Sequence, residues 1–123
     1  MRAKILNASA GSGKTYQLAY KYVRDVIDQP GLYRHILAVT FTNKATEEMK
    51  SRILKEIHRL ASGGASPYLE NLCRELSLDE RSVRKRAAEV RSKILHDYSR
   101  FTVLTIDTFF QRILRAFIKE LGI

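Results

Sequence analysis

Cysteine is nearly absent from this chain of 123 residues, which contains only Cys73. A single cysteine cannot form an intramolecular disulfide, so nothing indicates an oxidising compartment, and its leucine neighbours in a helical pattern favour a buried thiol. Long apolar runs are missing too, because none approaches the roughly 20 residues that span a membrane. Residues 1–7 lack the apolar core and cleavage site of a signal peptide. The sequence therefore predicts a cytoplasmic protein with no membrane partner.

Side chains for several kinds of catalysis are also missing. The three histidines, His35, His58 and His96, are scattered without the spacing of a metal site. No Ser-His-Asp set, carboxylate pair or cysteine nucleophile is recognisable. We therefore predict structural roles for the histidines.

Acidic residues are outnumbered by basic ones. Twenty-two Lys and Arg against thirteen Asp and Glu give a formal net charge of +9 at pH 7. This excess favours a polyanionic partner such as nucleic acid, although a small domain can carry such a charge for solubility alone. The hydrophobic share of 45% is enough to build the core of one compact domain.

Hydrophobic periodicity predicts strands that alternate with helices. Strands are expected around residues 5–6, at 36–41 and at 101–106. A first helix is expected between the glycine-bearing loop and Pro30, and a second at about 44–61 with Thr42 or Asn43 as N-cap. Two more helices are expected between residues 66 and 99, and a last one before Gly122. Such alternation implies a parallel sheet joined by right-handed crossovers. The predicted class is therefore α/β, a three-layer arrangement with a parallel sheet of about three strands and flanking helices.

Side-chain environments follow from the same periodicity. We expect Tyr22, Phe110 and Phe117 in the core, because each lies on the apolar face of a predicted helix. Basic residues gather largely on the outer face of the helix before residue 99, where a solvated surface is expected: Arg81, Arg84, Lys85, Arg86, Arg91 and Lys93.

The strongest chemical signal is a loop between the first strand and the first helix, which runs Ala8, Ser9, Ala10, Gly11, Ser12, Gly13, Lys14 and Thr15. Gly11 and Gly13 let the backbone curl so that its N–H groups point at phosphate oxygens. Lys14 would reach the β and γ phosphates, and the Thr15 hydroxyl would coordinate Mg²⁺. The usual pattern begins with glycine, where this chain has Ala8, and a small residue suffices there. We predict that this loop binds a nucleoside triphosphate with Mg²⁺.

Two further segments resemble superfamily-one helicases of the UvrD and RecB type. Residues 40–53, TFTNKATEEMKSRI, meet the family pattern T-F-T-N-K-A-A-x-E-M-x-x-R-I at nearly every place, with Thr46 where alanine is common. Residues 105–109, TIDTF, are similar to the T-x-H-x-F segment of the family, with Asp107 in the histidine position. The phosphate loop is closer to the RecB-like branch, and no glutamine-centred adenine motif precedes it.

This resemblance implies that residues 1–123 are a partial helicase motor domain, the first RecA-like ATP-binding domain of P-loop NTPase fold, with a helical insert at about 62–99. It implies ATP and Mg²⁺ as cofactors, single-stranded or partly duplex DNA as substrate, and a role in DNA repair or recombination. The remainder of the helicase, and possible nuclease or helicase subunits, are the implied protein partners.

The resemblance also implies which residues face DNA. Phe41 and Phe109 would lie near unpaired bases, where aromatic faces stack without sequence preference. Thr42, Asn43 and Thr105 would donate hydrogen bonds to the phosphate backbone. For Phe41 the alternative is a core residue at the end of a strand.

The 123 residues contain no acidic strand motif after the third predicted strand and no second motor domain with an arginine for the γ-phosphate. We therefore expect no catalytic residue in this segment and no hydrolysis by it alone. Two other functions stay open. In the first, the chain is a stand-alone P-loop module without a DNA role, and segment 40–53 disfavours this function. In the second, it is a DNA-binding fragment with a vestigial nucleotide site, and nucleotide titration would distinguish this fragment from a helicase motor domain.

Overall fold

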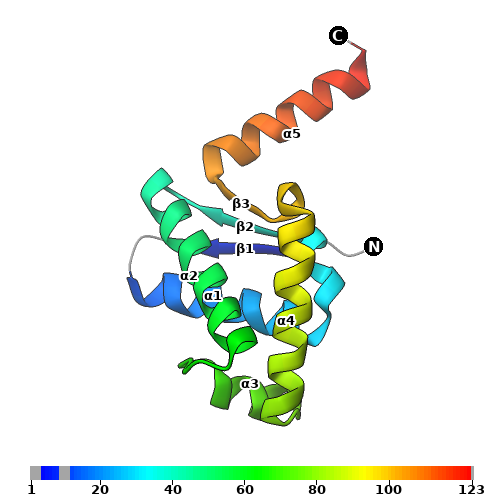
Figure 1. Cartoon of the computed structure of the whole chain (residues 1–123). Coiled ribbons are helices and arrows are strands. Elements are labelled where there is room, and N and C mark those ends of the chain that lie inside the picture. Colours follow the sequence, from blue (N-terminus) through cyan, green and yellow to red (C-terminus); the bar gives the residue numbers. More distant parts are fainter. Residues whose placement is uncertain (1–3, 9–11, 123) are drawn as a thin grey trace.

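The computed structural model describes residues 4–8 and 12–122, with side chains from Thr15 onward. Strands and helices alternate along the chain (Figure 1) in the order β1 (Lys4–Ala8), α1 (Ser12–Asp28), η1 (Pro30–His35), β2 (Ile36–Thr40), α2 (Asn43–Ser62), α3 (Leu69–Leu76), α4 (Glu80–His96), η2 (Tyr98–Arg100), β3 (Thr102–Thr105) and α5 (Ile106–Leu121). The elements η1 and η2 are short 3-10 helices. This order confirms the predicted α/β class.

The strands pair in parallel in the order β1-β2-β3. Their carboxyl ends are level, because Ala8 pairs with Thr40 and Thr40 pairs with Thr105. Whatever follows each strand therefore starts at the same edge of the sheet. In α/β sheets this is the edge at which ligands bind.

The core lies between the sheet and the helices α1, α2 and α4, which Figure 1 shows on one side of the strands. Tyr22 of α1 is fully buried there, as predicted, beside Phe101 with ring centres 5.6 Å apart. Ile53 and Val90, from α2 and α4, are also fully buried. Cys73 on α3 is only half-buried.

The helix α5 lies on the other side of the sheet and leans away from it (Figure 1). Phe110 and Phe117 are 59% and 60% exposed, so their assignment to the core is wrong. Only α5 covers this side within residues 4–8 and 12–122, so the predicted third layer consists there of one helix. Periodicity identified the apolar face of α5 correctly, but it carries no information about what packs against that face.

The ends of α2 are fixed by short-range hydrogen bonds. The Thr42 hydroxyl oxygen accepts a hydrogen bond of 3.0 Å from the Ala45 amide, which confirms Thr42 as the N-cap. At the other end Gly63 has a φ of 83°, a left-handed conformation that glycine adopts without strain, and its N–H donates to the Arg59 carbonyl. The start of α2 is therefore set at the carboxyl end of β2.

Two arginines of α4 satisfy carbonyl groups at the ends of other helices. Arg84 Nη1 donates to the Leu60 and Gly64 carbonyls at 3.1 and 3.0 Å, where α2 ends. Arg86 Nη1 donates to the Asp28 carbonyl at 2.9 Å, where α1 ends. The last carbonyls of a helix have no partner within it, and a cation there also complements the helix dipole. The prediction of a solvated basic surface is therefore wrong for Arg84 and Arg86.

Replacing Arg84 with alanine is expected to lower the free energy of unfolding by about 2 kcal/mol, the range of hydrogen bonds that involve a charged group. Urea unfolding followed by circular dichroism measures this change. Arg81→Ala is the control, because Arg81 is an exposed arginine of the same helix. Equal stability of the two variants would contradict a capping role for Arg84.

Candidate nucleotide-binding site

The predicted phosphate loop lies between β1 and α1. Ala8 is the last residue of β1 and Ser12 the first of α1, so Gly13, Lys14 and Thr15 belong to the first turn of the helix. Ser9, Ala10 and Gly11 lie outside the described residues, as do the side chains of Ser12 and Lys14. The backbone on either side has the strand-to-helix context that a phosphate loop requires. The positive end of α1 is thereby directed to the carboxyl edge of the sheet.

Thr15 has the environment expected of a magnesium ligand. Its side chain is 8% exposed and lies at the start of α1, whose first turn contains no acidic residue. A hydroxyl oxygen is a donor that Mg²⁺ accepts, and this cation usually takes its other ligands from phosphates and water. In the described part of the chain, no three His, Cys, Asp or Glu side chains gather to bind a metal by themselves. The residues present thus fit Mg²⁺ that arrives with a nucleotide.

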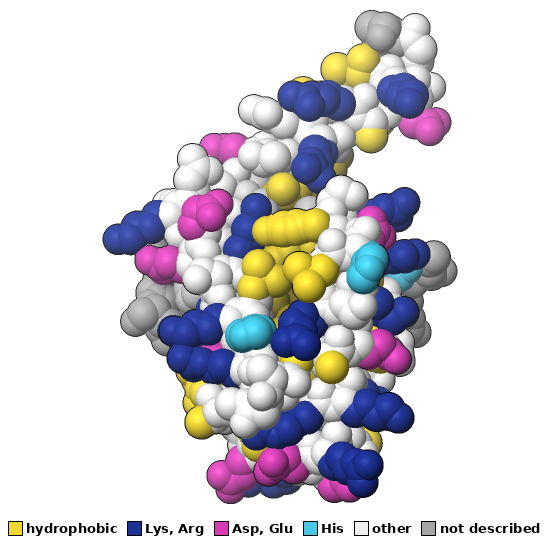
Figure 2. All heavy atoms as spheres, in the orientation of Figure 1, with side chains coloured by type: hydrophobic (Ala, Val, Ile, Leu, Met, Phe, Trp, Pro, Cys, Tyr) yellow, Lys and Arg dark blue, Asp and Glu magenta, His cyan; other side chains and the backbone are white. Residues whose placement is uncertain are grey.

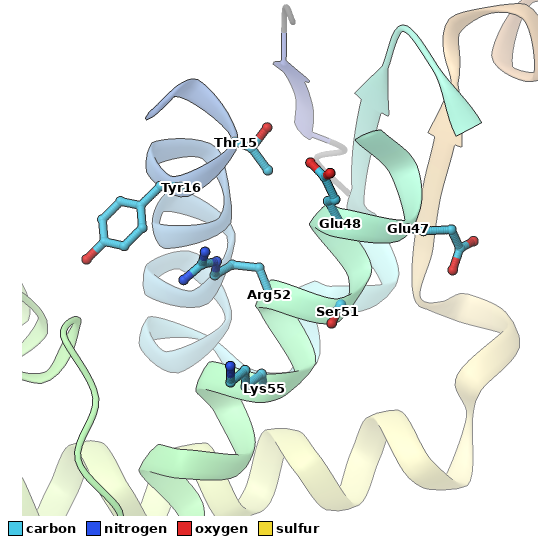
Figure 3. A pocket seen from close by; sticks show the side chains of 7 residues that line it. All are labelled: Thr15, Tyr16, Glu47, Glu48, Ser51, Arg52 and Lys55. Atoms are coloured by element: carbon cyan, nitrogen blue, oxygen red, sulfur yellow. The ribbon is translucent and has the colours of Figure 1, made fainter. Parts of the chain in front are cut away.

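A cleft of about 400 Å³ adjoins Thr15 between α1 and α2 (Figure 3). Its α2 wall carries two carboxylates and two cations: Glu47, Glu48, Arg52 and Lys55. In Figure 3, Glu48 and Arg52 point toward α1, whereas Glu47 points away. The Arg52 guanidinium lies 5.4 Å from the centre of the Tyr16 ring, within range of a cation–π interaction. The arginine of the family pattern is therefore next to the helix that carries Thr15.

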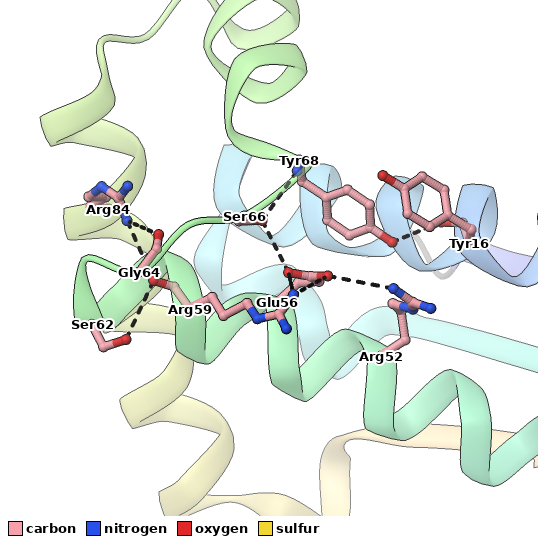
Figure 4. Close-up of polar contacts among 9 residues, drawn as sticks. All are labelled: Tyr16, Arg52, Glu56, Arg59, Ser62, Gly64, Ser66, Tyr68 and Arg84. Atoms are coloured by element: carbon pink, nitrogen blue, oxygen red, sulfur yellow. Dashed lines mark hydrogen bonds and ion pairs between the residues drawn. The ribbon is translucent and has the colours of Figure 1, made fainter.

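A buried carboxylate lies behind Arg52 (Figure 4). Glu56 is fully buried, with Arg52 at 3.7 Å, Arg59 at 3.4 Å and the Ser66 hydroxyl, which donates to it, at 3.2 Å. A buried charge is tolerated when it is paired and hydrogen-bonded in this way. Sequence reasoning missed this group, since a glutamate within a charged helix gives no local sign of burial.

Tyr68 connects the segment after α2 to the first helix. Its hydroxyl donates to the Tyr16 carbonyl at 2.9 Å (Figure 4). Burial raises the pKa of the Tyr68 phenol above its ordinary value, so the hydroxyl keeps its proton and remains a donor at neutral pH. Neither Tyr68 nor Tyr16 was predicted as a site residue.

Phe41, Thr42 and Asn43 follow β2 directly and are exposed at the carboxyl edge. Phe41 is 51% exposed, so the alternative of a core residue is wrong. The Thr42 hydroxyl accepts the capping bond from Ala45, which leaves its proton to donate elsewhere. The geometry of these residues is compatible with contacts to a strand of nucleic acid.

Thr105 and Phe109 are less accessible than the residues after β2. The Thr105 hydroxyl caps α5, since it donates to the Thr108 hydroxyl at 2.9 Å and accepts from the Thr108 amide at 3.3 Å. Phe109 is half-buried and lines a cleft between α5 and the sheet together with Leu37 and Leu104. The structure thus brings Thr105 to the edge shared with Thr40, whereas Phe109 forms part of the wall of the cleft between α5 and the sheet.

Charge is spread over the visible surface. Figure 2 shows Lys and Arg side chains interspersed with Asp and Glu over the face that it presents, without a continuous basic tract. Along the described chain, no helix is both long enough and apolar enough to cross a bilayer.

The family model of the UvrD/REP helicase N-terminal domain matches residues 2–123. The chain belongs to this family. The RecBCD enzyme subunit RecB of Escherichia coli (strain K12) is 31% identical over 127 aligned residues, which cover 97% of this chain and 11% of that protein. A subunit of the ATP-dependent helicase/nuclease of Bacillus mycoides (strain KBAB4) is 36% identical over 76 residues, which cover 60% of this chain and 6% of that protein. No solved structure matches the chain significantly.

Membership of the UvrD/REP helicase family confirms the resemblance inferred from the three motifs. The chain spans about a tenth of the length of the RecB proteins that it matches over most of its own length. In this UvrD/REP helicase N-terminal domain, one edge of the sheet is shared by three segments: the start of α1, the residues after β2 and the N-cap of α5.

Proposed function

We propose that this chain is the ATP-binding part of an ATP-dependent DNA helicase or translocase that acts in DNA repair or recombination. The observation that carries the proposal is the register of the strands. The level carboxyl ends of the strands support it, since the exposed segment 41–43 follows β2 at the same sheet edge from which the chain continues to the first turn of α1, which contains Thr15. A nucleotide site and a DNA site on neighbouring loops are what a motor domain needs to couple the two ligands.

The roles within this edge follow from the chemistry of each group. Lys14 is proposed to neutralise the β and γ phosphates, and Thr15 to ligate Mg²⁺ with the N-terminus of α1 behind it. ATP supplies the free energy of hydrolysis when it is bound. Phe41 is proposed to stack on unpaired bases, with hydrogen bonds from Thr42 and Asn43 to the phosphate backbone.

The names of the relatives support the proposal that the chain is part of a larger helicase. One is called a subunit of the RecBCD enzyme, and the other a subunit of an ATP-dependent helicase/nuclease. We therefore propose that the chain works as the first RecA-like domain of a larger motor, with residues 62–99 as a helical insert. A nuclease activity and a partner subunit belong to the same proposal.

A DNA experiment separates this function from a nucleotide-binding module without a DNA role. Phe41→Ala is expected to weaken binding of single-stranded DNA by roughly 1–3 kcal/mol, the contribution of one stacked base. The salt dependence should stay unchanged, because it reports phosphate contacts, about 0.7 counter-ions each on single strands. Fluorescence anisotropy with labelled oligonucleotides at several salt concentrations measures both quantities.

Phe117→Ala is the matched control, since Phe117 is similarly exposed, at 60%, but lies on α5 outside the edge segment 41–43. Equal affinity of wild type and Phe41→Ala would refute base stacking by Phe41. No binding of single-stranded DNA by the wild-type chain would favour the module without a DNA role.

A further inference from the structure

We propose that Tyr68 is a positioning residue of the nucleotide site, through which the α3–α4 segment (Leu69–His96) holds the first turn of α1 in its binding conformation. Tyr68 has no position in the family motifs and lies far along the sequence from the phosphate loop. The inference rests on the proposed nucleotide-binding function.

Tyr68 is packed onto the beginning of α1. Its side chain is 1% exposed, and its ring meets those of Tyr16 and Tyr20 edge to face, with centres 5.1 and 5.2 Å apart. Such contacts are favourable in addition to the burial of the rings. The hydroxyl then reaches the Tyr16 carbonyl at 2.9 Å. Tyr16 follows Thr15 directly, so the bond acts on the backbone next to the magnesium ligand.

Tyr68 itself is held in place by the turn that precedes it. The Ser66 hydroxyl accepts a hydrogen bond from the Tyr68 amide at 3.2 Å and donates to Glu56 at 3.2 Å (Figure 4). Arg84 binds the Gly64 carbonyl in the same turn at 3.0 Å. The backbone around Tyr68 is thereby tied to both α2 and α4, which are part of the core. Tyr68 is therefore a fixed support and not the tip of a free loop.

Tyr16 is contacted on a second side. Arg52 of α2 lies over its ring at 5.4 Å, and Arg52 is in turn 3.7 Å from the buried carboxylate of Glu56. The ring and the carbonyl of one residue are thus restrained from two different elements. The first N–H groups of a helix lack partners within it, so its first turn is the part that frays most easily. A phosphate loop must hold the N–H groups of this turn and the adjacent Thr15 hydroxyl in position at the same time. A restraint on the backbone at this turn therefore favours nucleotide binding.

The α3–α4 segment also contacts the C-terminal end of α1. Arg86 donates to the Ile27 and Asp28 carbonyls, at 3.3 and 2.9 Å. Between these ends, the Tyr20 hydroxyl donates to Glu75 of α3 at 2.8 Å in an exposed contact. Like the bond of Tyr68, the Tyr20–Glu75 bond is made by a single phenol hydroxyl, but it lies one helical turn further from Thr15. It offers a matched control for Tyr68.

The test compares Tyr68→Phe with Tyr20→Phe, since each removes one hydroxyl and keeps the ring. We expect Tyr68→Phe to weaken binding of a non-hydrolysable ATP analogue with Mg²⁺ about two- to tenfold, the effect of one hydrogen bond. Amide hydrogen exchange at residues 15–20 of the nucleotide-free chain should accelerate by a similar factor, with exchange in α4 unchanged. Tyr20→Phe should leave the affinity and the exchange at residues 15–20 as in wild type.

Several outcomes would overturn the positioning role. Unchanged affinity in Tyr68→Phe, or an equal loss in both variants, would mean that the hydroxyl does not act on the nucleotide site. Acceleration of exchange throughout α1 and α4 would show a general loss of stability instead. If the wild-type chain bound no nucleotide, the proposed function would fail together with this inference, whereas wild-type binding without a difference between the variants removes this inference alone.

Discussion

Purified 123-residue chain is expected to bind Mg-ATP and yet release no phosphate above background, with or without single-stranded DNA. Transfer of a phosphoryl group to water needs an oriented nucleophile and stabilisation of charge on the γ-phosphate, and an arginine finger alone contributes about 10³–10⁵ in rate. In the roles proposed for them, Lys14 and Thr15 supply only the binding of the ground state. The missing contributions therefore predict a loss of several orders of magnitude relative to a complete motor.

The acidic residues near the edge are not expected to replace a catalytic carboxylate. Asp107 follows β3 but lies exposed in the first turn of α5. Glu47 and Glu48 belong to α2, where Glu48 shares its cleft wall with the cations Arg52 and Lys55. Glu47 and Glu48 lie on a helix, and the family resemblance puts Asp107 in the DNA-facing segment, so we expect none of them to orient water beside Mg²⁺.

A coupled phosphate-release assay measures this prediction. A longer polypeptide that includes an acidic strand motif and a second motor domain should show hydrolysis stimulated by DNA. DNA-stimulated turnover by the 123-residue chain that disappears in Lys14→Ala would contradict the expectation and would show that these residues form a complete active site.

Removal of the Lys14 ammonium should have the largest effect on nucleotide affinity. Without this cation the phosphate charge faces the loop and the helix N-terminus alone, and a charge-assisted hydrogen bond is worth about 1.5–3 kcal/mol. Lys14→Ala is therefore expected to weaken binding of an ATP analogue roughly 10- to 100-fold. Titration with a fluorescently labelled nucleotide gives the two dissociation constants.

Lys21→Ala is a suitable control for Lys14→Ala, because Lys21 is an exposed lysine of the same helix, away from its first turn. Its affinity should equal that of wild type. A comparable loss in both variants would mean that the nucleotide responds to the overall charge of the chain and not to the loop.

Features that depend on neighbouring residues were predictable from the sequence. The motifs at Thr15, Thr42 and Thr105 each come at or just beyond the end of an apolar strand, so parallel pairing alone brings them to one edge. The capping role of Thr42 also follows from its position before a helical pattern. Local sequence therefore indicated the class of fold and the strand-to-helix context of the predicted phosphate loop.

Features that depend on distant residues were not predictable. Arg84 and Arg86 belong to a helix face that is polar by pattern, yet their side chains end on carbonyl groups of α2 and α1. Phe117 belongs to an apolar face, yet it is exposed because α5 leans away from the sheet. Periodicity reports which residues share a face, whereas burial depends on what lies opposite. The role proposed for Tyr68 was unpredictable for the same reason, since its partner Tyr16 is 52 residues away in the chain.

Binding of a magnesium nucleotide by the loop from Ala8 to Thr15 can be measured by calorimetric titration of the wild-type chain with a non-hydrolysable ATP analogue. Titrations with Mg²⁺ and with a chelator in its place should show one site per chain that binds more tightly with the metal, because Thr15 contributes to affinity only through it. The same titration of Lys14→Ala should show clearly weaker binding. Equal affinity of wild type and Lys14→Ala, or no saturable heat from the wild-type chain, would contradict nucleotide binding by this loop.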